Sequence, residues 1–371
     1  MARAPHDARV RRLTLLALVI AAGSSLALAA EQHNTGRRDA AHEVAYVAPD
    51  VRREMIRRAR IWTPTDVAAM DVRLGPQAAR QILPGATVNC SYRPRRYSHG
   101  HSPKFECVLP GGDAVKVKYG RRDPEVYAEV IATRLLWALG FGANSEYPVS
   151  VACSDCSSDP WHRPKPEPGI RTFDPAMIER RMKGHQIETH DRSGWSWSEL
   201  DLIDANAGGA PMAHRDALKL LAVLLQHTDN KPAQQRLICL DHHWKAGDVC
   251  SHPFMYLHDV GLTFGAASMW NFMHTAGLNF EKWANAPVWK DSAACIGNLE
   301  KSVGGTFGNP RIGEAGRAFL ATLLSQLTDR QIEDLFTVAR VDRYSTDAAP
   351  GDWAAAFKQK RAQVVNHSCP S

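Results

Sequence analysis

The chain has 371 residues, which is enough for one large domain or for two lobes that each bury a hydrophobic core. Its composition is that of an ordinary globular protein. The formal net charge is +6, but Lys and Arg are interspersed with acidic residues and form no long basic stripe. The sequence therefore excludes a dedicated nucleic-acid-binding protein.

Residues 1–29 have the layout of a secretory signal peptide. Four arginines precede the apolar run Leu13–Ile20, and small residues then lead to an A-x-A site at Ala27-Leu28-Ala29. The alternative is an uncleaved membrane anchor, because the stretch 13–30 is just long enough to span a bilayer. No second apolar run has that length. We expect export to a periplasm, the extracellular space or a secretory lumen, with membrane contact only if this segment stays attached.

The charge and the cysteines agree with export. Residues 1–29 carry four Arg and one Asp, so the remaining chain has a net charge of only +3. Eight cysteines in an exported chain suggest disulfides, although about 105 connectivities are possible. Local spacing favours Cys90–Cys107, Cys153–Cys156, Cys239–Cys250 and Cys295–Cys369. The alternative for Cys153-Ser-Asp-Cys156 is a redox or zinc site, but no second C-x-x-C supports zinc.

The first half of the chain reads as helix, then strands, then helix. Residues 30–82 are charged, with a helical pattern near 51–60, and we expect an N-terminal extension there. Residues 83–120 are β-rich, and 113–120 alternate as a strand does. A helical pattern follows over 126–139. Asp123 and Pro124 are its start signals, and Gly140 is its stop signal.

Further strands and helices follow in chain order. Residues 147–152 read as a strand, 159–169 as a Pro-rich insertion, and 177–182 as a short segment that connects two lobes. From residue 214 the chain is helix-rich, with amphipathic helices expected over 316–327 and 329–340.

A polar stretch interrupts this helical region. A buried helix is expected to end at Gln226, and His227-Thr228-Asp229 follows it directly. Short apolar runs at 237–240 and 255–257 then read as two strands. Asp259-Val260-Gly261 comes directly after His258, 30 residues beyond Asp229.

This order of motifs resembles that of a protein-kinase-like fold. In kinases the catalytic loop has the motif H-x-D-x-x-x-x-N, and the metal-binding loop has the motif D-F-G. The likeness is closest to the atypical branch: HipA-type kinases, spore-coat CotH kinases, secretory-pathway casein-phosphorylating kinases and phosphoinositide kinases. It implies an α+β, two-lobed fold with a β-rich N-lobe over residues 83–176 and a helix-rich C-lobe over 177–371.

The resemblance also implies roles for particular residues. Lys118 is the phosphate-binding lysine, with Lys116 as its competitor, and Glu129 is the helix partner, with Glu125 as the alternative. Asp229 is the base that accepts the hydroxyl proton. Asp259 and the amide of Gln234, which stands where kinases have Asn, hold the metal; Gln235 is the alternative to Gln234. The nucleotide-covering loop is expected near residues 98–102, which contain one glycine.

The implied function is that of an exported atypical kinase. It would transfer the γ-phosphoryl group of ATP, with Mg²⁺ or Mn²⁺, to a hydroxyl of a protein, sugar or lipid. Two alternatives belong to other classes. The first is a catalytically inactive pseudokinase that serves as a binding module. The second is a zinc hydrolase that uses the histidines at 242, 243, 252 and 258.

Overall fold

The computed structural model describes residues 44–76, 82–95, 100–265, 277–302 and 304–370. The predicted signal peptide and the alternative anchor lie outside these ranges. Helices and strands are mixed in an α+β arrangement, as expected. No helix in the described ranges is long and apolar enough to cross a membrane.

The strands are β1 (Val44–Tyr46), β2 (Thr87–Arg93), β3 (Lys104–Val108), β4 (Ala114–Tyr119), β5 (Ser145–Ser154), β6 (Ile170–Arg180), β7 (His185–Glu188), β8 (Gln235–Cys239), β9 (Pro253–Leu257), β10 (Trp289–Asp291) and β11 (Ile296–Gly297). The helices are α2 (Pro49–Arg57), α3 (Glu125–Ala138), α4 (Met212–Leu225), α5 (Phe280–Asn285), α6 (Glu314–Ser325), α7 (Asp329–Val338), α8 (Val341–Tyr344) and α9 (Pro350–Val365).

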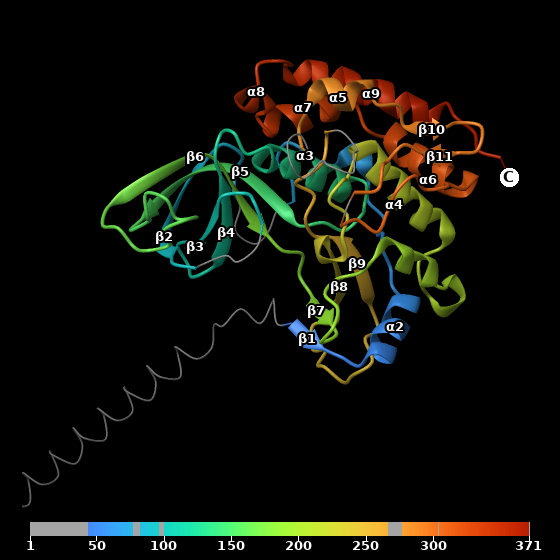
Figure 1. Ribbon diagram of the computed structural model, residues 1–371, viewed down its shortest axis with the longest axis horizontal. Coiled ribbons are helices and arrows are strands. Elements are labelled where there is room, and N and C mark those ends of the chain that lie inside the picture. Colours follow the sequence, from blue (N-terminus) through green and yellow to red (C-terminus); the bar gives the residue numbers. More distant parts are fainter. Residues whose placement is uncertain (1–43, 77–81, 96–99, 266–276, 303, 371) are drawn as a thin grey trace, which may run out of the picture. The chain divides into compact units, whose positions relative to one another are not determined.

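Strands β2–β6 form a closed barrel with the order β2-β3-β4-β6-β5 (Figure 1). The barrel closes through the parallel pairing of β2 with β5, whereas its other neighbours are antiparallel. Successive side chains of a strand point to opposite faces. Val115 and Val117 of β4 therefore fill the barrel interior with Phe105 of β3. Lys116 and Lys118, at the alternate positions, face outward.

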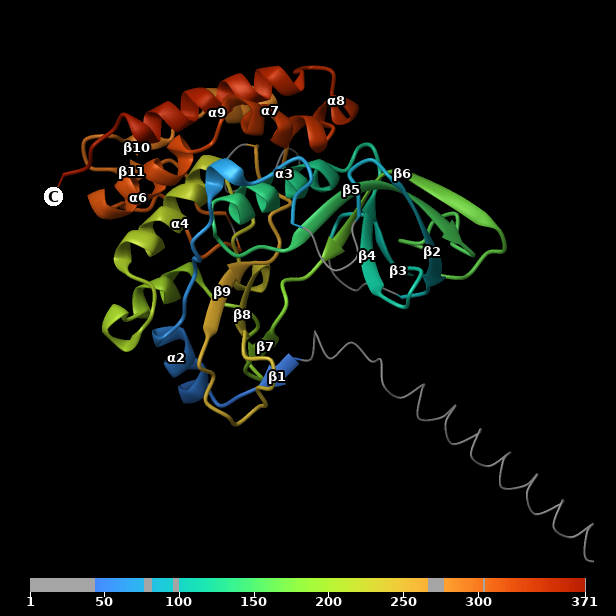
Figure 2. The ribbon, with the colours of Figure 1, turned by 180° about the vertical axis from the view of Figure 1, so that it is seen from behind.

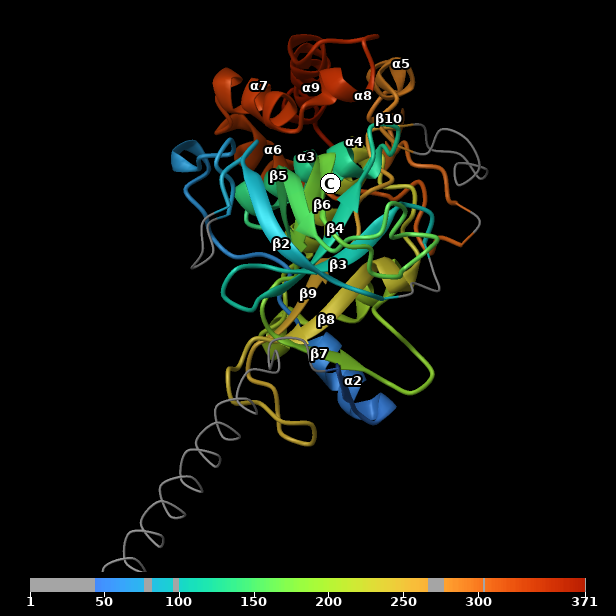
Figure 3. The same cartoon turned by 90° about the vertical axis from the view of Figure 1, so that its left-hand side faces the viewer.

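Helix α3 covers this outward face. It lies between the barrel and the helices α7 and α9 in two perpendicular views (Figures 1 and 3), and it packs on β5 and on α7. Nearly all of its residues are buried, Glu129 and Arg134 included. A helix that is enclosed on all sides needs no polar face. The few charged side chains that α3 carries must therefore find partners in the interior.

A second sheet has the strand order β1-β7-β8-β9. Its β8 and β9 form an antiparallel hairpin in which Gln235 pairs with Leu257. The segment before β8 and the segment after β9 therefore leave the sheet side by side. This end of the hairpin points toward α3 (Figure 2). One hydrophobic core joins this sheet to α3, α4, α6, α7 and α9.

Most of the expected elements are confirmed. Strand β4, helix α3, the β8–β9 hairpin and helices α6 and α7 lie where their patterns placed them, and Gly140, two residues after the end of α3, adopts a positive φ of 84°. The expected connecting segment 177–182 is wrong for its first four residues. They belong to β6, because Met177 pairs with both Lys118 and Pro148 in the barrel wall.

The four expected disulfides are all confirmed: Cys90–Cys107, Cys153–Cys156, Cys239–Cys250 and Cys295–Cys369. No cysteine among the described residues is free. The C-x-x-C pair is therefore disulfide-bonded and does not form a zinc site. Four disulfides indicate an oxidising environment.

The loop lengths that these disulfides close predict how much each bond contributes to the free energy of unfolding. Cys295 and Cys369 are 74 residues apart, whereas Cys153 and Cys156 are 3 apart. Loop-closure entropy predicts that replacing the first pair by Ser lowers the free energy of unfolding by roughly 4 kcal/mol, against roughly 2 kcal/mol for the second pair. Urea denaturation of the two double variants measures both values. Equal losses would contradict the entropic account.

Candidate functional site

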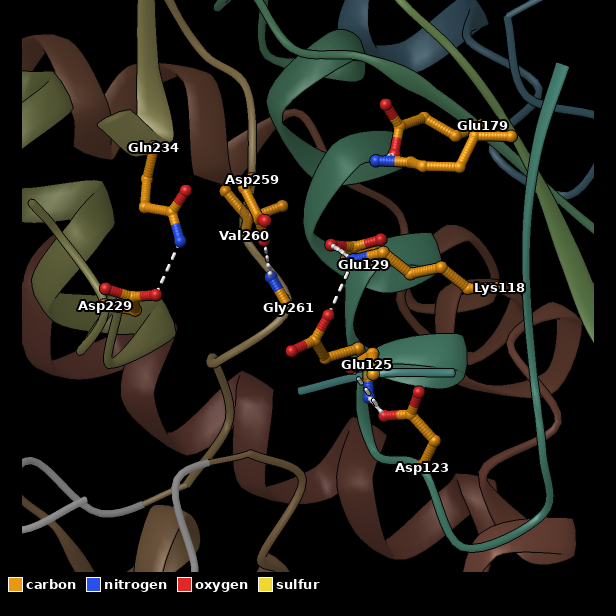
Figure 4. Close-up of polar contacts among 12 residues, drawn as sticks. Lys118, Asp123, Glu125, Glu129, Glu179, Asp229, Gln234, Asp259, Val260 and Gly261 are labelled. Atoms are coloured by element: carbon orange, nitrogen blue, oxygen red, sulfur yellow. Dashed lines mark hydrogen bonds and ion pairs between the residues drawn. The ribbon is translucent and has the colours of Figure 1, made fainter. Parts of the chain in front are cut away.

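Lys118 lies at the centre of the candidate site. Its Nζ is 2.6 Å from Oε2 of Glu125 and 2.6 Å from Oε1 of Glu129, and its side chain is 1% exposed (Figure 4). The predicted ion pair of Lys118 with Glu129 is therefore present, and the alternative partner Glu125 contacts the same ammonium. Glu125 and Glu129 are four residues apart, so they share one face of α3.

Lys116 has a different partner. It forms an ion pair with Glu179 of β6, which lies directly across from it in the barrel wall. Glu179 in turn pairs in register with Glu146 of β5. Glu146 is buried, and its Oε2 has no hydrogen-bond partner. Burial, together with the charges of Glu179 and Glu129, raises the pKa of Glu146 well above its usual range.

Asp259, on the loop after β9, belongs to the same cluster of charged side chains. Its backbone N–H donates to the carbonyl of Gln234 at 3.0 Å. Carboxylate oxygens of Glu125, Glu129 and Asp259 all lie within 4.8 Å of one another. Ionising all three carboxyls around a single ammonium costs free energy, because the carboxylates repel one another and are shielded from water.

The charge is divided unequally among these groups. Burial alone would raise the pKa of Asp259, but Lys118 and Lys116 lower it far below its usual value. Burial raises the pKa of Glu129 well above its usual range. Burial opposes the charged form of Lys118, yet Asp259, Glu125 and Glu129 raise its pKa. These directions favour the charged forms of Asp259 and Lys118, whereas burial opposes the charged form of Glu129.

Gly261 allows the loop of Asp259 to approach α3 closely. A Cβ at this position would lie 2.6 Å from Cγ of Glu125. The Gly261 N–H also donates to Oδ1 of Asp259 at 3.3 Å. The glycine of the D-x-G motif is thus required here by close packing against Glu125.

Asp229 lies beside this cluster, on the loop between α4 and β8. Its Oδ2 accepts hydrogen bonds from Nζ of Lys231 at 2.8 Å and from Nε2 of Gln234 at 2.5 Å. Its side chain is 22% exposed, so it is accessible to solvent. In Figure 4, Asp259 lies between Asp229 and the Lys118 cluster. The structure therefore brings all the predicted site residues to one region.

The two glutamines of this loop are placed differently. Gln234 directs its amide nitrogen to Asp229. Gln235 is buried in β8, and its amide lies next to the indole of Trp197 and the carbonyl of Lys231. Gln235 is therefore directed away from the carboxylate cluster.

His227 is a buried, neutral residue. Neither of its ring nitrogens has a hydrogen-bond partner. Burial lowers its pKa to about 4, although the nearby Asp229 and Asp259 oppose this shift. Of the four histidines considered for zinc, His258 bonds to Asn144 and His252 pairs with Asp241. In the described part of the chain, no metal-capable group combines any of the four.

The sequence did not identify two residues that shape the site. Asn230 is buried and ties the loop to residues 306 and 307: its Oδ1 accepts from both of their backbone N–H groups, and its Nδ2 donates to the carbonyls of Phe307 and His227. Asn144 donates from Nδ2 to the carbonyl of His258 at 2.9 Å. Single amides that bridge distant segments leave no periodic signal.

Asp123, expected only as a helix start signal, also contacts the site. Its Oδ1 accepts from Oγ of Ser102 and from the N–H of Glu125, both at 3.1 Å. Its Oδ2 is buried without a partner. Burial and the charge of Glu125 raise the pKa of Asp123 from 3.8 to about 7. Asp123 thus links the loop before β3 to the start of α3.

Comparisons with known proteins give little beyond this geometry. No family model matches the chain, and no curated protein matches it. Among solved structures, it is similar to a Helicobacter pylori proinflammatory kinase, CtkA, with 7% sequence identity and a TM-score of 0.41. That similarity covers 76% of this chain and 96% of the other.

The raised pKa of Asp123 predicts a pH effect on stability. The folded state holds this proton up to about pH 7, whereas the unfolded state loses it near pH 4, so the stabilisation is complete below about pH 4 and is lost as the pH rises through 7. Asp123→Asn keeps a neutral side chain at every pH. Urea denaturation at about pH 5 and about pH 8 should show the variant gaining stability relative to the wild type at the higher pH. The wild type and the variant both contain Glu129 and Glu146, so the titration of these two groups cancels when the proteins are compared. An identical difference in unfolding free energy at both pH values would contradict the assignment.

Proposed function

We propose that this chain is an ATP-dependent phosphotransferase with a two-lobed, kinase-like architecture. The barrel and α3 would form the N-lobe, and the hairpin β8–β9 with the later helices would form the C-lobe. The observation that carries the proposal is the burial of Lys118 beside two α3 carboxylates and Asp259, with Asp229 beyond Asp259 (Figure 4). Phosphoryl transfer needs little more than positioned charge of this kind.

The residues present fit a nucleotide-bound divalent cation. Hard cations such as Mg²⁺ and Mn²⁺ prefer oxygen ligands, and Glu125, Glu129 and Asp259 place theirs within 4.8 Å of one another. Oε2 of Glu129 is buried without a hydrogen-bond partner, which leaves a free acceptor in the cluster. The cation would neutralise charge on the phosphates. We assign Asp259 and Glu129 as its main ligands and Lys118 as the phosphate-binding group.

Asp229 is the proposed general base. Its side chain is more exposed than those of Glu125 and Glu129, so it can meet an acceptor hydroxyl from solvent. The ammonium of Lys231 lies 2.8 Å from its Oδ2, and the amide of Gln234 donates to the same oxygen and orients the carboxylate. On this assignment Gln234 positions the base and is not a metal ligand. The acceptor would be a hydroxyl of a protein, sugar or lipid.

A binding-only module is the second candidate. The same contacts of Lys231 and Gln234 with Asp229 favour it, because they occupy the carboxylate that would accept the proton. In both cases we propose that residues 1–29 direct export, and the four disulfides support that proposal.

Two carboxylate variants should give different phenotypes. Asp229→Asn should reduce phosphoryl transfer by about a hundredfold to ten-thousandfold, while nucleotide binding stays unchanged. Asp259→Ala should abolish the stabilisation that ATP and Mg²⁺ together produce in a thermal-shift assay, because it removes a cation ligand. Autophosphorylation or transfer to a generic protein acceptor, measured with γ-labelled ATP, reports the first effect.

Asp248→Asn serves as the matched control, because Asp248 is exposed in the β8–β9 hairpin loop and should leave both readouts unchanged. If Asp229→Asn retains full transfer, Asp229 is not the base. If the wild type binds ATP with Mg²⁺ but transfers no phosphoryl group to any acceptor, the binding-only module replaces the kinase.

A further inference from the structure

Three lysines share one face of the barrel wall. Lys104 of β3 lies directly across from Lys118 of β4, and Lys116 is two residues before Lys118 on the same strand. Because positions across from each other in a sheet share a face, all three side chains lie on the outer side. Lys118 and Lys116 have glutamate partners there. The proposed function uses only Lys118.

The ammonium of Lys104 lies close to Trp161 and Gly100. Its Nζ lies 5.1 Å from the ring centroid of Trp161, which belongs to the insertion between β5 and β6. On another side it contacts Gly100, where a Cβ would collide with Nζ. Gly100 has a φ of +96°, a conformation that other residues rarely adopt. The backbone conformation favours a glycine here, and the absence of a side chain leaves room for the end of Lys104 in its present position.

The charge around Lys104 is unfavourable for a third cation. Burial lowers its pKa, and the charges of Lys118 and Lys116 lower it further. Glu125 and Asp259 act in the opposite direction and are outweighed. A bound polyanion would relieve this repulsion. Asp259, the proposed metal ligand, is one of the charges that act on this ammonium.

The position of Lys104 in the chain points to the ligand. It begins β3, directly after the loop that joins β2 to β3. In kinases a glycine-rich loop between two strands of the N-lobe covers the nucleotide phosphates, and the β2–β3 loop would correspond to it here. Among residues 94, 95 and 100–103, the described part of this loop, Gly100 is the one glycine. A side-chain ammonium at the end of the loop would supply the attraction that glycine-rich loops obtain from backbone N–H groups.

We propose that Lys104 is a second phosphate-binding lysine, which contacts the terminal phosphates of a nucleoside triphosphate opposite Lys118. This inference rests on the proposed nucleotide site. It adds a specificity: the protein should prefer a triphosphate to a diphosphate, and both to the nucleoside. The hydrogen bond from Ser102 to Asp123 fastens the end of this loop, two residues before Lys104, to the start of α3.

Calorimetric titration of the full exported chain with ATP, ADP and adenosine, each with Mg²⁺, tests the proposal. Lys104→Met should weaken ATP binding by about tenfold to a hundredfold, as expected for loss of a hydrogen bond to a charged group, and should leave adenosine binding unchanged. Lys104→Arg keeps the charge and should retain most of the affinity. Lys290→Met, at an exposed lysine on β10, is the control and should bind as the wild type does.

A structural role of Lys104 predicts a different pattern. If the lysine only fastens the insertion through Trp161, then Trp161→Leu should weaken ATP binding as much as Lys104→Met does. That result would overturn the proposal, as would equal losses for ATP, ADP and adenosine or no loss at all. If the folded wild type binds none of the three ligands, the proposed function itself fails, and this inference fails with it.

Discussion

The site depends on the burial of one ammonium group, that of Lys118. Removing a charge from water costs several kcal/mol unless well-placed partners compensate. Here Glu125 and Glu129 each approach to 2.6 Å, and Asp259 adds a third carboxyl. The partners belong to two different parts of the chain, α3 and the loop after β9. The barrel and the second sheet must therefore be correctly packed for this charge to be tolerated.

Several local features serve this arrangement. The alternation of β4 directs Lys118 outward while Val117 fills the barrel. The hairpin register brings the loops of Asp229 and Asp259 together, and the disulfide Cys239–Cys250 closes the hairpin at its other end. Gly261 then allows the Asp259 loop to pack on Glu125. Each feature is ordinary by itself, and their common result is a cluster of opposite charges in a buried place.

Much of this could be predicted from the sequence, because the elements concerned carry periodic signals. Alternation identified β4, and apolar periodicity with Pro124 and Gly140 identified α3. The cysteine spacings identified four disulfides that the structure contains. The closure of the barrel through parallel β2 and β5 could not be predicted, since long-range pairing leaves no local pattern.

The parts of the site that were missed depend on tertiary contacts. Glu146 and Glu179 are adjacent only because β5 and β6 pair in this register. The pKa of Asp123 is raised by burial, which no local pattern reports. The first residues of the expected connection 177–182 were misassigned for the same reason, since their pairing with β4 and β5 continues β6.

The central claim is that Lys118 lies in a nucleotide phosphate site, and affinity labelling tests it most directly. An acyl-phosphate derivative of ATP transfers its acyl group to a lysine beside the bound phosphates, and peptide mass spectrometry then identifies the residue. We expect labelling within the β3–β4 segment, at Lys118 or at Lys104 opposite it, and protection of that lysine by excess ATP with Mg²⁺. Labelling confined to surface lysines, or labelling that ATP does not suppress, would contradict it.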